Sequence, residues 1–298
     1  MFVVLHPKET AMTVNQAYTR LEQALTPLYG LGEAKSISNI VFKDYLKLSL
    51  HSEKDDHLFE ALLQDDYLKI EERLLRSEPV QYVVGFSWFY GLNFKVNPSV
   101  LIPRPETEEL VHWVLETVKA KTKLQSQQPT SILDIGTGSG CIPITLKLKH
   151  PSLKISALDV SEAALITASK NAYRLQAEVH FQRVNILDAH ESDPLPQYDT
   201  IISNPPYIPN KERSLMSDNV LKYEPELALF VEDEDPLIFY ITIADFAIKH
   251  LPPKGYLFFE CNAFNAIEVV DMLKRKGFEE VELRKDMSGQ DRMIRAIL

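Results

Sequence analysis

The stretch from Ser131 to Asp159 limits the possible fold more than any other part of the chain. Ser131-Ile132-Leu133-Asp134-Ile135 has the apolar, β-branched composition of a buried strand, and glycines follow it at once. A helix is expected from about Cys141 to Lys149, and the next strand, Lys154 to Leu158, ends in Asp159. This order predicts a βαβ unit, the building block of a parallel sheet with helices on both faces.

The spacing of the glycines indicates which nucleotide such a unit binds. In Gly136-Thr137-Gly138-Ser139-Gly140 the last glycine comes one residue earlier than in the dinucleotide fingerprint G-x-G-x-x-G, which requires glycine where Cys141 stands. Asp159 lies 19 positions after Gly140, where an acid can hold a ribose diol. A glycine turn alone can be just a tight strand–helix connection. With the strand, the helix and the terminal acid, it favours a nucleoside site.

A second motif, Thr200-Ile201-Ile202-Ser203-Asn204-Pro205-Pro206-Tyr207, begins as a buried strand and stops at two prolines. Asn204 would therefore lie at the end of a strand, where open α/β sheets bind ligands. Its side-chain carbonyl and the Pro205 carbonyl are two acceptors that suit the two hydrogens of a planar NH2 group. Tyr207 adds a face for a flat substrate. Because Asn-Pro is also common in turns, a plain double-proline turn explains the motif about equally well.

The remaining pattern predicts three parts. Residues 1–78 show helical spacing of apolar residues, with breaks at Pro27 and at Gly30-Leu31-Gly32, and indicate a helical bundle. Such a bundle is either a stabilising appendage or, as is common at the N-terminus of an enzyme, a domain that selects a macromolecular partner; we expect the second. Residues 79–102 alternate, as in Val80, Tyr82 and Val84, and predict a β-hairpin linker. Residues 103–298 predict an α/β domain, a doubly wound, mainly parallel sheet of about seven strands.

The expected elements of the third part alternate regularly. Helices are expected at 163–174, 236–250 and 265–276, and strands at 178–183, 200–203, 255–260, 279–285 and 292–298. A further helix should open at Pro105, with glutamates in its first turn, where the helix dipole favours negative charge. Ser288-Gly289-Gln290-Asp291 is expected to be the hairpin turn between the last two strands.

Composition excludes several classes of protein. The net charge of −10 over 298 residues disfavours non-specific binding to nucleic acid. Two cysteines make neither a disulfide framework nor a thiolate metal cluster, and no metal is expected. The chain has no apolar stretch long enough for a membrane span, so we expect a cytoplasmic protein. Nothing in the sequence demands more than a monomer.

Taken together, the motifs resemble a known family. Asp134 to Gly140 is similar to the cofactor loop of class I S-adenosylmethionine methyltransferases, and Asn204-Pro205-Pro206-Tyr207 to their amino-group motif. Leu101-Ile102-Pro103-Arg104-Pro105-Glu106-Thr107-Glu108, the helical N-terminus and Ser288 to Arg292 narrow the resemblance to the release-factor glutamine N5-methyltransferases (the HemK or PrmC family). The resemblance covers nearly the whole chain and is strongest after Pro79.

The resemblance implies a substrate, a cofactor and a partner. The family methylates the side-chain amide of the glutamine in the Gly-Gly-Gln motif of class 1 peptide chain release factors. S-adenosylmethionine would be the donor and S-adenosylhomocysteine the product. The resemblance implies no direct nucleic-acid binding.

The resemblance also assigns residues to the site. It places the methionine part and sulfonium of the cofactor along Gly136, Thr137, Gly138, Ser139 and Gly140, with the ribose hydroxyls on Asp159. Adenine would lie near Asn185 and Ile186. Asn185 departs from the acidic residue usual there, and Asp188 is the alternative. The catalytic and substrate-binding residues would be Asn204, Pro205, Pro206 and Tyr207, and Asn204 would also contact the cofactor.

Two other functions stay open on sequence alone. An exocyclic amine of adenine presents the same two hydrogens as a glutamine amide, so an N6-adenine or other nucleic-acid methyltransferase is the first alternative. The acidic charge and the lack of a basic domain argue against it. A catalytically idle binding module is the second, and the intact glycines and Asn204 argue against that.

Overall fold

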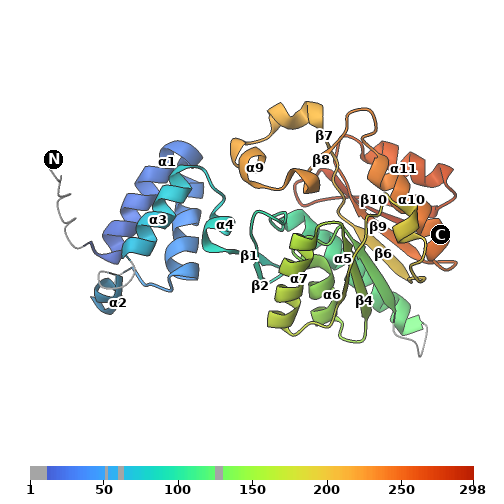
Figure 1. The fold of residues 1–298 in the computed structure, drawn as a ribbon, viewed down its shortest axis with the longest axis horizontal. Coiled ribbons are helices and arrows are strands. Elements are labelled where there is room, and N and C mark those ends of the chain that lie inside the picture. Colours follow the sequence, from blue (N-terminus) through green and yellow to red (C-terminus); the bar gives the residue numbers. More distant parts are fainter. Residues whose placement is uncertain (1–11, 51–52, 60–63, 125–129) are drawn as a thin grey trace. The chain divides into compact units, whose positions relative to one another are not determined.

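The structure is a computed structural model that describes residues 12–50, 53–59, 64–124 and 130–298 (Figure 1). The chain divides into two compact units, Met1–Gly85 and Phe86–Leu298. Residues 1–11, 51–52 and 60–63 of the expected helical bundle lie outside the described residues.

The first unit is helical, as its apolar spacing predicts. Its elements are α1 (Val14–Asn39), the π-helical turn η1 (Ile40–Tyr45), α2 (Glu53–Leu58), α3 (Gln64–Leu75) and α4 (Val80–Val84). Thr13 caps α1, since its side chain accepts from the Gln16 N–H while the Gln16 side chain accepts from the Thr13 N–H. Fully buried side chains from these helices form the core: Leu21, Leu25, Phe42, Phe59, Tyr67 and Leu74.

Two predictions for this unit are wrong. Pro27 lies inside α1 and does not end it, whereas Gly30 does interrupt the helical path, at φ 76° and ψ 161°. Val80–Val84 is a helix and not the expected strand. Four of its five residues are buried, so the alternation of apolar residues does not separate an inner face from an outer one. The Arg73 guanidinium donates to the carbonyls of Tyr82 and Val83 at the end of this helix, which the sequence pattern could not show.

The hairpin that the sequence predicts opens the second unit. Strands β1 (Phe86–Phe89) and β2 (Leu92–Lys95) pair antiparallel, with Phe89 opposite Leu92. Tyr90 and Gly91 connect them, both at positive φ (53° and 75°), as a two-residue turn of the I′ class requires. The Asn171 side chain accepts from the Lys95 N–H and donates to the Lys95 carbonyl, which fixes the hairpin against α7 (Glu162–Leu175).

The rest of this unit is the predicted doubly wound sheet. Its seven strands lie in the order β10-β11-β9-β6-β3-β4-β5, and β11 runs in the opposite direction to the other six. The strands are β3 (Ser131–Ile135), β4 (Lys154–Asp159), β5 (His180–Arg183), β6 (Thr200–Ser203), β9 (Tyr256–Glu260), β10 (Glu279–Lys285) and β11 (Asp291–Ile297). From β3 the chain adds β4 and β5 on one side and then returns to place β6 on the other side of β3. The crevice between the carboxyl ends of β3 and β6 is where such a sheet binds ligands.

Helices cover both faces of the sheet (Figure 1). Alternate residues of one strand enter different cores: Ile201 packs into the core that also contains residues of α10 (Ile238–His250) and α11 (Ala266–Arg275). Ile202 packs into the other core, with residues of α5 (Pro105–Leu124) and α6 (Cys141–Lys149). α8 (Ala189–Ser192) is a single short turn. No described helix is both long and apolar enough to cross a membrane.

The sequence patterns gave no expectation for the segment between β6 and α10. It contains β7 (Ile208–Pro209), η3 (Asn210–Leu215), α9 (Asp218–Tyr223), η4 (Glu226–Ala228) and β8 (Phe230–Val231). Strands β7 and β8 form a small parallel pair of their own, apart from the main sheet. The short elements between β7 and β8 supply part of the wall of a cavity at the carboxyl ends of the central strands.

Candidate active site

The site lies at the carboxyl ends of the central strands. In the sheet, Ile135 at the end of β3 is the partner of Ser203 at the end of β6. Gly136 follows the first and Asn204 follows the second, so the glycine turn and the Asn-Pro-Pro-Tyr motif face each other across the crevice where strand order reverses. Two motifs that are about 70 residues apart in the sequence thus meet because their strands are neighbours.

The larger cavity, of about 390 Å³, lies along the glycine turn. That volume falls within the roughly 300–1,000 Å³ of small-molecule pockets. Its wall is largely apolar, with a few polar groups; it includes Gly136, Gly138, Leu158, Asp159, Val160, Asn185, Ile186, Leu187, Asn204, Pro205, Pro206 and Ile243. A Cβ added at Gly136 or Gly138 would meet no other atom within 4 Å, so these two glycines leave open space beside the backbone.

The other residues of the turn do not line this cavity. Thr137 and Ser139 are buried, at 4% and 2% exposure. Gly140 serves packing, because a Cβ there would lie 2.9 Å from Ile144 Cδ1 and 3.1 Å from Ala168 Cβ. The five residues expected to hold a cofactor thus divide into two that face the cavity and three that support the turn.

Asp159 fixes the shape of the turn as well as facing the cavity. Its carboxylate accepts from the backbone N–H of Gly138 (2.8 Å) and of Ser161 (2.9 Å). Burial raises the pKa of Asp159, and these backbone hydrogen bonds lower it in part. Each carboxylate oxygen keeps a lone pair, so the group can still accept from two hydroxyls of a ligand.

Asn185 and Ile186 line the larger cavity, and Asp188 does not. The Asn185 side chain accepts from the Leu187 N–H at 3.1 Å. The Asp188 side chain caps α8 by accepting from the His190 N–H at 2.9 Å. Of the two alternatives left by the sequence, the geometry favours Asn185 and Ile186.

Asn204 is held by a chain of side chains from three elements. Its Nδ2 donates to Thr107 Oγ1 (3.3 Å), in the first turns of α5. Thr107 Oγ1 donates to Glu260 Oε2 (2.6 Å), at the end of β9, and the Tyr207 hydroxyl donates to Glu260 Oε1 (3.5 Å). No described residue donates to Asn204 Oδ1 or to the Pro205 carbonyl. Both acceptors are therefore available to a ligand.

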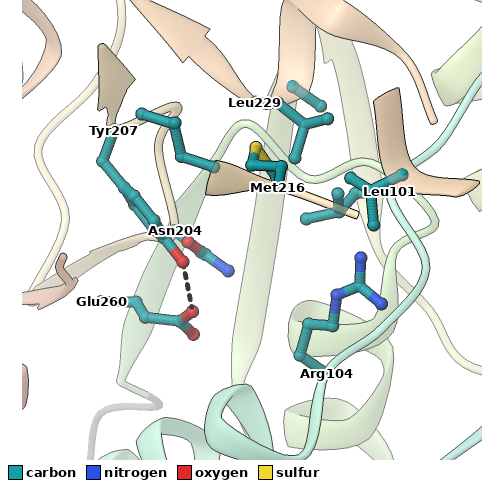
Figure 2. A pocket seen from close by; sticks show the side chains of 10 residues that line it. Leu101, Arg104, Asn204, Tyr207, Met216, Leu229 and Glu260 are labelled. Atoms are coloured by element: carbon teal, nitrogen blue, oxygen red, sulfur yellow. Dashed lines mark hydrogen bonds between the residues drawn. The ribbon is translucent and has the colours of Figure 1, made fainter. Parts of the chain in front are cut away.

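A second, smaller cavity of about 170 Å³ lies on the other side of Asn204. Figure 2 shows Tyr207, Asn204 and Glu260 converging on it, with Arg104 opposite and Leu101, Met216 and Leu229 as apolar wall. Leu101, Asn204 and Ala228 line both cavities. Asn204 is thus the polar group that the two cavities share.

Glu224 connects the wall of the smaller cavity to the segment before α5. Its buried carboxylate pairs with the Arg104 guanidinium and accepts from the Ile102 N–H at 3.1 Å. Glu224 directly follows α9, so this contact fixes the segment between β6 and α10 over the cavity. The rigid Pro103-Arg104-Pro105 sequence presents Arg104 in one direction, as its two prolines predict.

Burial controls the ionisation of the site. It raises the pKa of Glu260 to about 7, against the lowering effect of hydrogen bonds from Thr107 and Tyr207 and of the Arg292 charge. Burial next to Glu260 raises the pKa of Tyr207, so its hydroxyl stays protonated and remains a donor. Burial also raises the pKa of Asp134, which lies in β3 just before the glycine turn, to about 7.

Comparison with known proteins identifies the family. A model of the family "Methyltransferase small domain" matches residues 117–223. The release factor glutamine methyltransferase of Flavobacterium psychrophilum is 39% identical over 290 residues, which are 95% of this chain and 99% of that protein. That of Bacteroides thetaiotaomicron is 40% identical over 286 residues, again 95% of this chain and 99% of the relative.

The chain belongs to the release factor glutamine methyltransferase family. The resemblance found in its motifs is thereby confirmed, and so is the prediction of an enzyme. Among solved structures, the hMettl16 catalytic domain in complex with MAT2A 3'UTR hairpin 6 has a TM-score of 0.54 at 16% identity, over 78% of this chain and 80% of that one. At that identity the likeness concerns the fold alone. A methyltransferase family implies S-adenosylmethionine as the methyl donor.

The motif analysis assigned no separate role to three residues of this methyltransferase site: Thr107, Glu224 and Glu260. Thr107 stands inside the quoted Pro-Arg-Pro-Glu-Thr stretch, and its position in the first turns of a helix gave no reason to single it out. Glu260 ends an apolar strand as Asp159 does, a signal that could have been used. Glu224 stands in a segment without a periodic pattern, and nothing in the sequence marks it.

Proposed function

We propose that this chain transfers a methyl group from S-adenosylmethionine to the side-chain amide nitrogen of the glutamine in the Gly-Gly-Gln motif of class 1 peptide chain release factors. The observation that carries the proposal is Asn204, which lies between two cavities with its amide nitrogen held by Thr107 and its oxygen unpaired. The names of the relatives supply the release factor and the glutamine, and the resemblance of the motifs supplies the Gly-Gly-Gln site. A cytoplasmic location, without direct contact to nucleic acid, fits such a task.

The residues of the larger cavity fit S-adenosylmethionine. Gly136 and Gly138 leave room beside the backbone for the amino-acid portion, where any Cβ would take up the space. The carboxylate of Asp159 can accept from both ribose hydroxyls, and Asn185 with Ile186 can border the adenine. Thr137, Ser139 and Gly140 are packed behind the turn and support its backbone without lining the cavity. When bound, the cofactor supplies an electrophilic methyl group on a positively charged sulfur.

The glutamine side chain would occupy the smaller cavity, with its amide at Asn204, which lines both cavities. Asn204 Oδ1 and the Pro205 carbonyl, on the wall of the larger cavity, accept its two hydrogens, while Pro206 has no N–H to compete. An amide nitrogen is a weak nucleophile because its lone pair is delocalised. Fixing both hydrogens turns that lone pair towards the methyl donor, so catalysis is mainly orientation and proximity. Tyr207, Leu101 and Leu229 exclude water and pack against the aliphatic part. No general base is needed at the start, because the nitrogen becomes acidic once methylated.

We assign recognition of the release factor to the helical unit. The described residues of this unit line neither cavity. A glutamine loop that enters a cavity of about 170 Å³ offers only a small contact area, which by itself supports weak binding. A second contact through the helices raises the effective concentration of the glutamine and selects one protein among many.

The test is the variant Asn204→Ala with its control Asn210→Ala. By analogy with the loss of one preorganised polar group, Asn204→Ala should lower turnover on release factor by about 10²–10³, with a smaller effect on cofactor affinity. Asn210 lies in the next segment, but its amide contacts Glu232 and lines neither cavity, so its variant should keep normal turnover. Normal turnover by Asn204→Ala would show that the two acceptors do not hold the substrate.

A further inference from the structure

The orientation of the Asn204 amide depends on the side chains that are hydrogen-bonded to it in series, Thr107 and then Glu260. The oxygen and nitrogen of an asparagine amide have nearly the same size, so packing alone does not choose between the two orientations. The partner of Asn204 is Thr107, whose hydroxyl can donate or accept. If its proton were free, Thr107 could donate to Oδ1 of a flipped amide, and a nitrogen would then face the substrate.

Glu260 removes that freedom. An ionised carboxylate only accepts, and Glu260 accepts from Thr107 at 2.6 Å and from Tyr207 at 3.5 Å. Once the Thr107 proton points to Glu260, only lone pairs remain on Oγ1 for Asn204. The amide must then present Nδ2 to Thr107 and keep Oδ1 for a ligand. Thr107 and Glu260 are 3% and 2% exposed, so water does not compete for these bonds.

We propose that Glu260 is a positioning residue for methyl transfer, which acts through Thr107 to fix the Asn204 amide with its oxygen available to the substrate. This inference rests on the proposed function and adds to it the group that sets the direction of the hydrogen bonds. Glu260 also lines the smaller cavity, so direct contact with the substrate is the competing role.

The charge state of Glu260 gives the orientation a pH dependence. The charged or titratable groups around it are Arg292 of β11, Glu106 of α5, Tyr207 after β6 and Cys261 next along the chain. The Arg292 charge favours the ionised carboxylate, and Glu106 opposes it. Because the pKa of Glu260 is about 7, the carboxyl is protonated below that pH and can itself donate to Thr107. The Thr107 proton is then free for the flipped amide.

The experiment uses four full-length chains: wild type, Glu260→Gln, Thr107→Val and Thr107→Ser. A glutamine at 260 can donate its NH2 to Thr107 and so permits the flipped amide. Glu260→Gln and Thr107→Val should each lower kcat on release factor by about 10- to 100-fold, as loss of an outer-shell partner does elsewhere. Thr107→Ser keeps the hydroxyl and should retain most of kcat. Calorimetric titration should show that the S-adenosylmethionine Kd of the four chains changes far less than kcat does.

The pH profile separates positioning from mere structural support. Wild-type kcat should rise through about pH 7, and Glu260→Gln should lack this rise. Asp134 also titrates near pH 7, but it is intact in both chains and cannot explain the difference. If Glu260→Gln keeps wild-type kcat, or if it loses activity while Thr107→Val does not, Glu260 does not act through Thr107 and the proposal is refuted.

A second readout needs no substrate. The NMR signals of the Asn204 side-chain NH2, assigned by their loss in Asn204→Ala, should shift near pH 7 in the wild type and not in Glu260→Gln. Side-chain NH2 signals of Asn204 that do not shift with pH in the wild type would overturn the inference. If these signals titrate as expected but the wild type does not methylate release factor, the proposed function fails and the orientation device stands.

Discussion

Two glycines of the cofactor turn should respond differently to the same added methyl group. Gly140 has a φ of +79°, and its added Cβ would lie 2.9 Å from Ile144 Cδ1 and 3.1 Å from Ala168 Cβ. An alanine there costs about 1–2 kcal/mol for the left-handed backbone and about 1–3 kcal/mol for overpacking. Gly140→Ala should therefore lower the free energy of unfolding by about 2–5 kcal/mol.

Gly138 is the matched control, because it belongs to the same turn and also has positive φ, +54°. Its added Cβ meets nothing within 4 Å, so Gly138→Ala should lose only the backbone cost of about 1–2 kcal/mol. The new methyl group would instead enter the larger cavity, which Gly138 lines. We therefore expect Gly138→Ala to lose affinity for S-adenosylmethionine while it remains the more stable of the two variants.

Urea unfolding gives the stabilities, and calorimetric titration of each folded variant gives the affinities. Equal stability of the two variants would refute the packing role assigned to Gly140. Wild-type affinity in Gly138→Ala would show that the cofactor does not lie along this part of the turn.

Three further predictions concern other parts of the molecule. Asp159→Ala should weaken S-adenosylmethionine binding by about 1.5–3 kcal/mol, and Asp188→Ala should leave it unchanged in the same titration. Glu260 has its pKa raised from 4.5 to about 7, so its contribution to stability is fully present below pH 4.5 and is lost as the pH rises through about 7. Over that window Glu260→Gln should remove about 3 kcal/mol of pH dependence from the unfolding free energy, and an unchanged urea profile would contradict the burial effect. Deletion of residues 1–85 should spare cofactor binding but sharply reduce methylation of release factor; a folded deletion that methylates it as well as the whole chain would remove the helical unit from recognition.

The deletion ends at residue 85 because of what the structure adds to the sequence. The linker was expected to begin at Pro79, but Val80–Val84 is a helix whose end is held by Arg73 of α3. A cut after Glu78 would remove Arg73 and leave that helix without its partner. A short alternating stretch cannot reveal such a contact, since the decisive group comes from another element.

The sequence predicted the sheet well for a physical reason. Buried parallel strands consist of short runs rich in apolar and β-branched residues, and Ser131–Ile135 and Thr200–Ser203 are runs of this kind, too short for a helix and bounded by glycine or proline. The glycine turn and the double proline then mark where the strands end. The local signals thus placed each motif at the end of a strand. The structure adds that β3 and β6 are neighbours, and the carboxyl ends of parallel neighbours lie at the same edge of the sheet, so Gly136 and Asn204 meet.

The residues that hold Asn204 and the wall of the smaller cavity in place could not be predicted in the same way. Thr107, Glu224 and Glu260 come from α5, the segment after α9, and β9, and their roles depend on contacts across 97 to 153 positions of the chain. Such contacts leave no periodic signal. The segment between β6 and α10 likewise consists of short elements, whose pattern is too brief to read from hydrophobic spacing.

We expect the methyl group to go to the glutamine of the Gly-Gly-Gln motif. The most direct measurement incubates the full chain with S-adenosylmethionine and a class 1 release factor, and in parallel with DNA and with RNA, and locates the methyl group by fragment mass spectrometry. We predict one added methyl group, on the side-chain amide of that glutamine, and none on either nucleic acid. A methyl group on an adenine amine, or an unmodified release factor beside a methylated nucleic acid, would show that this chain is not a release factor glutamine methyltransferase.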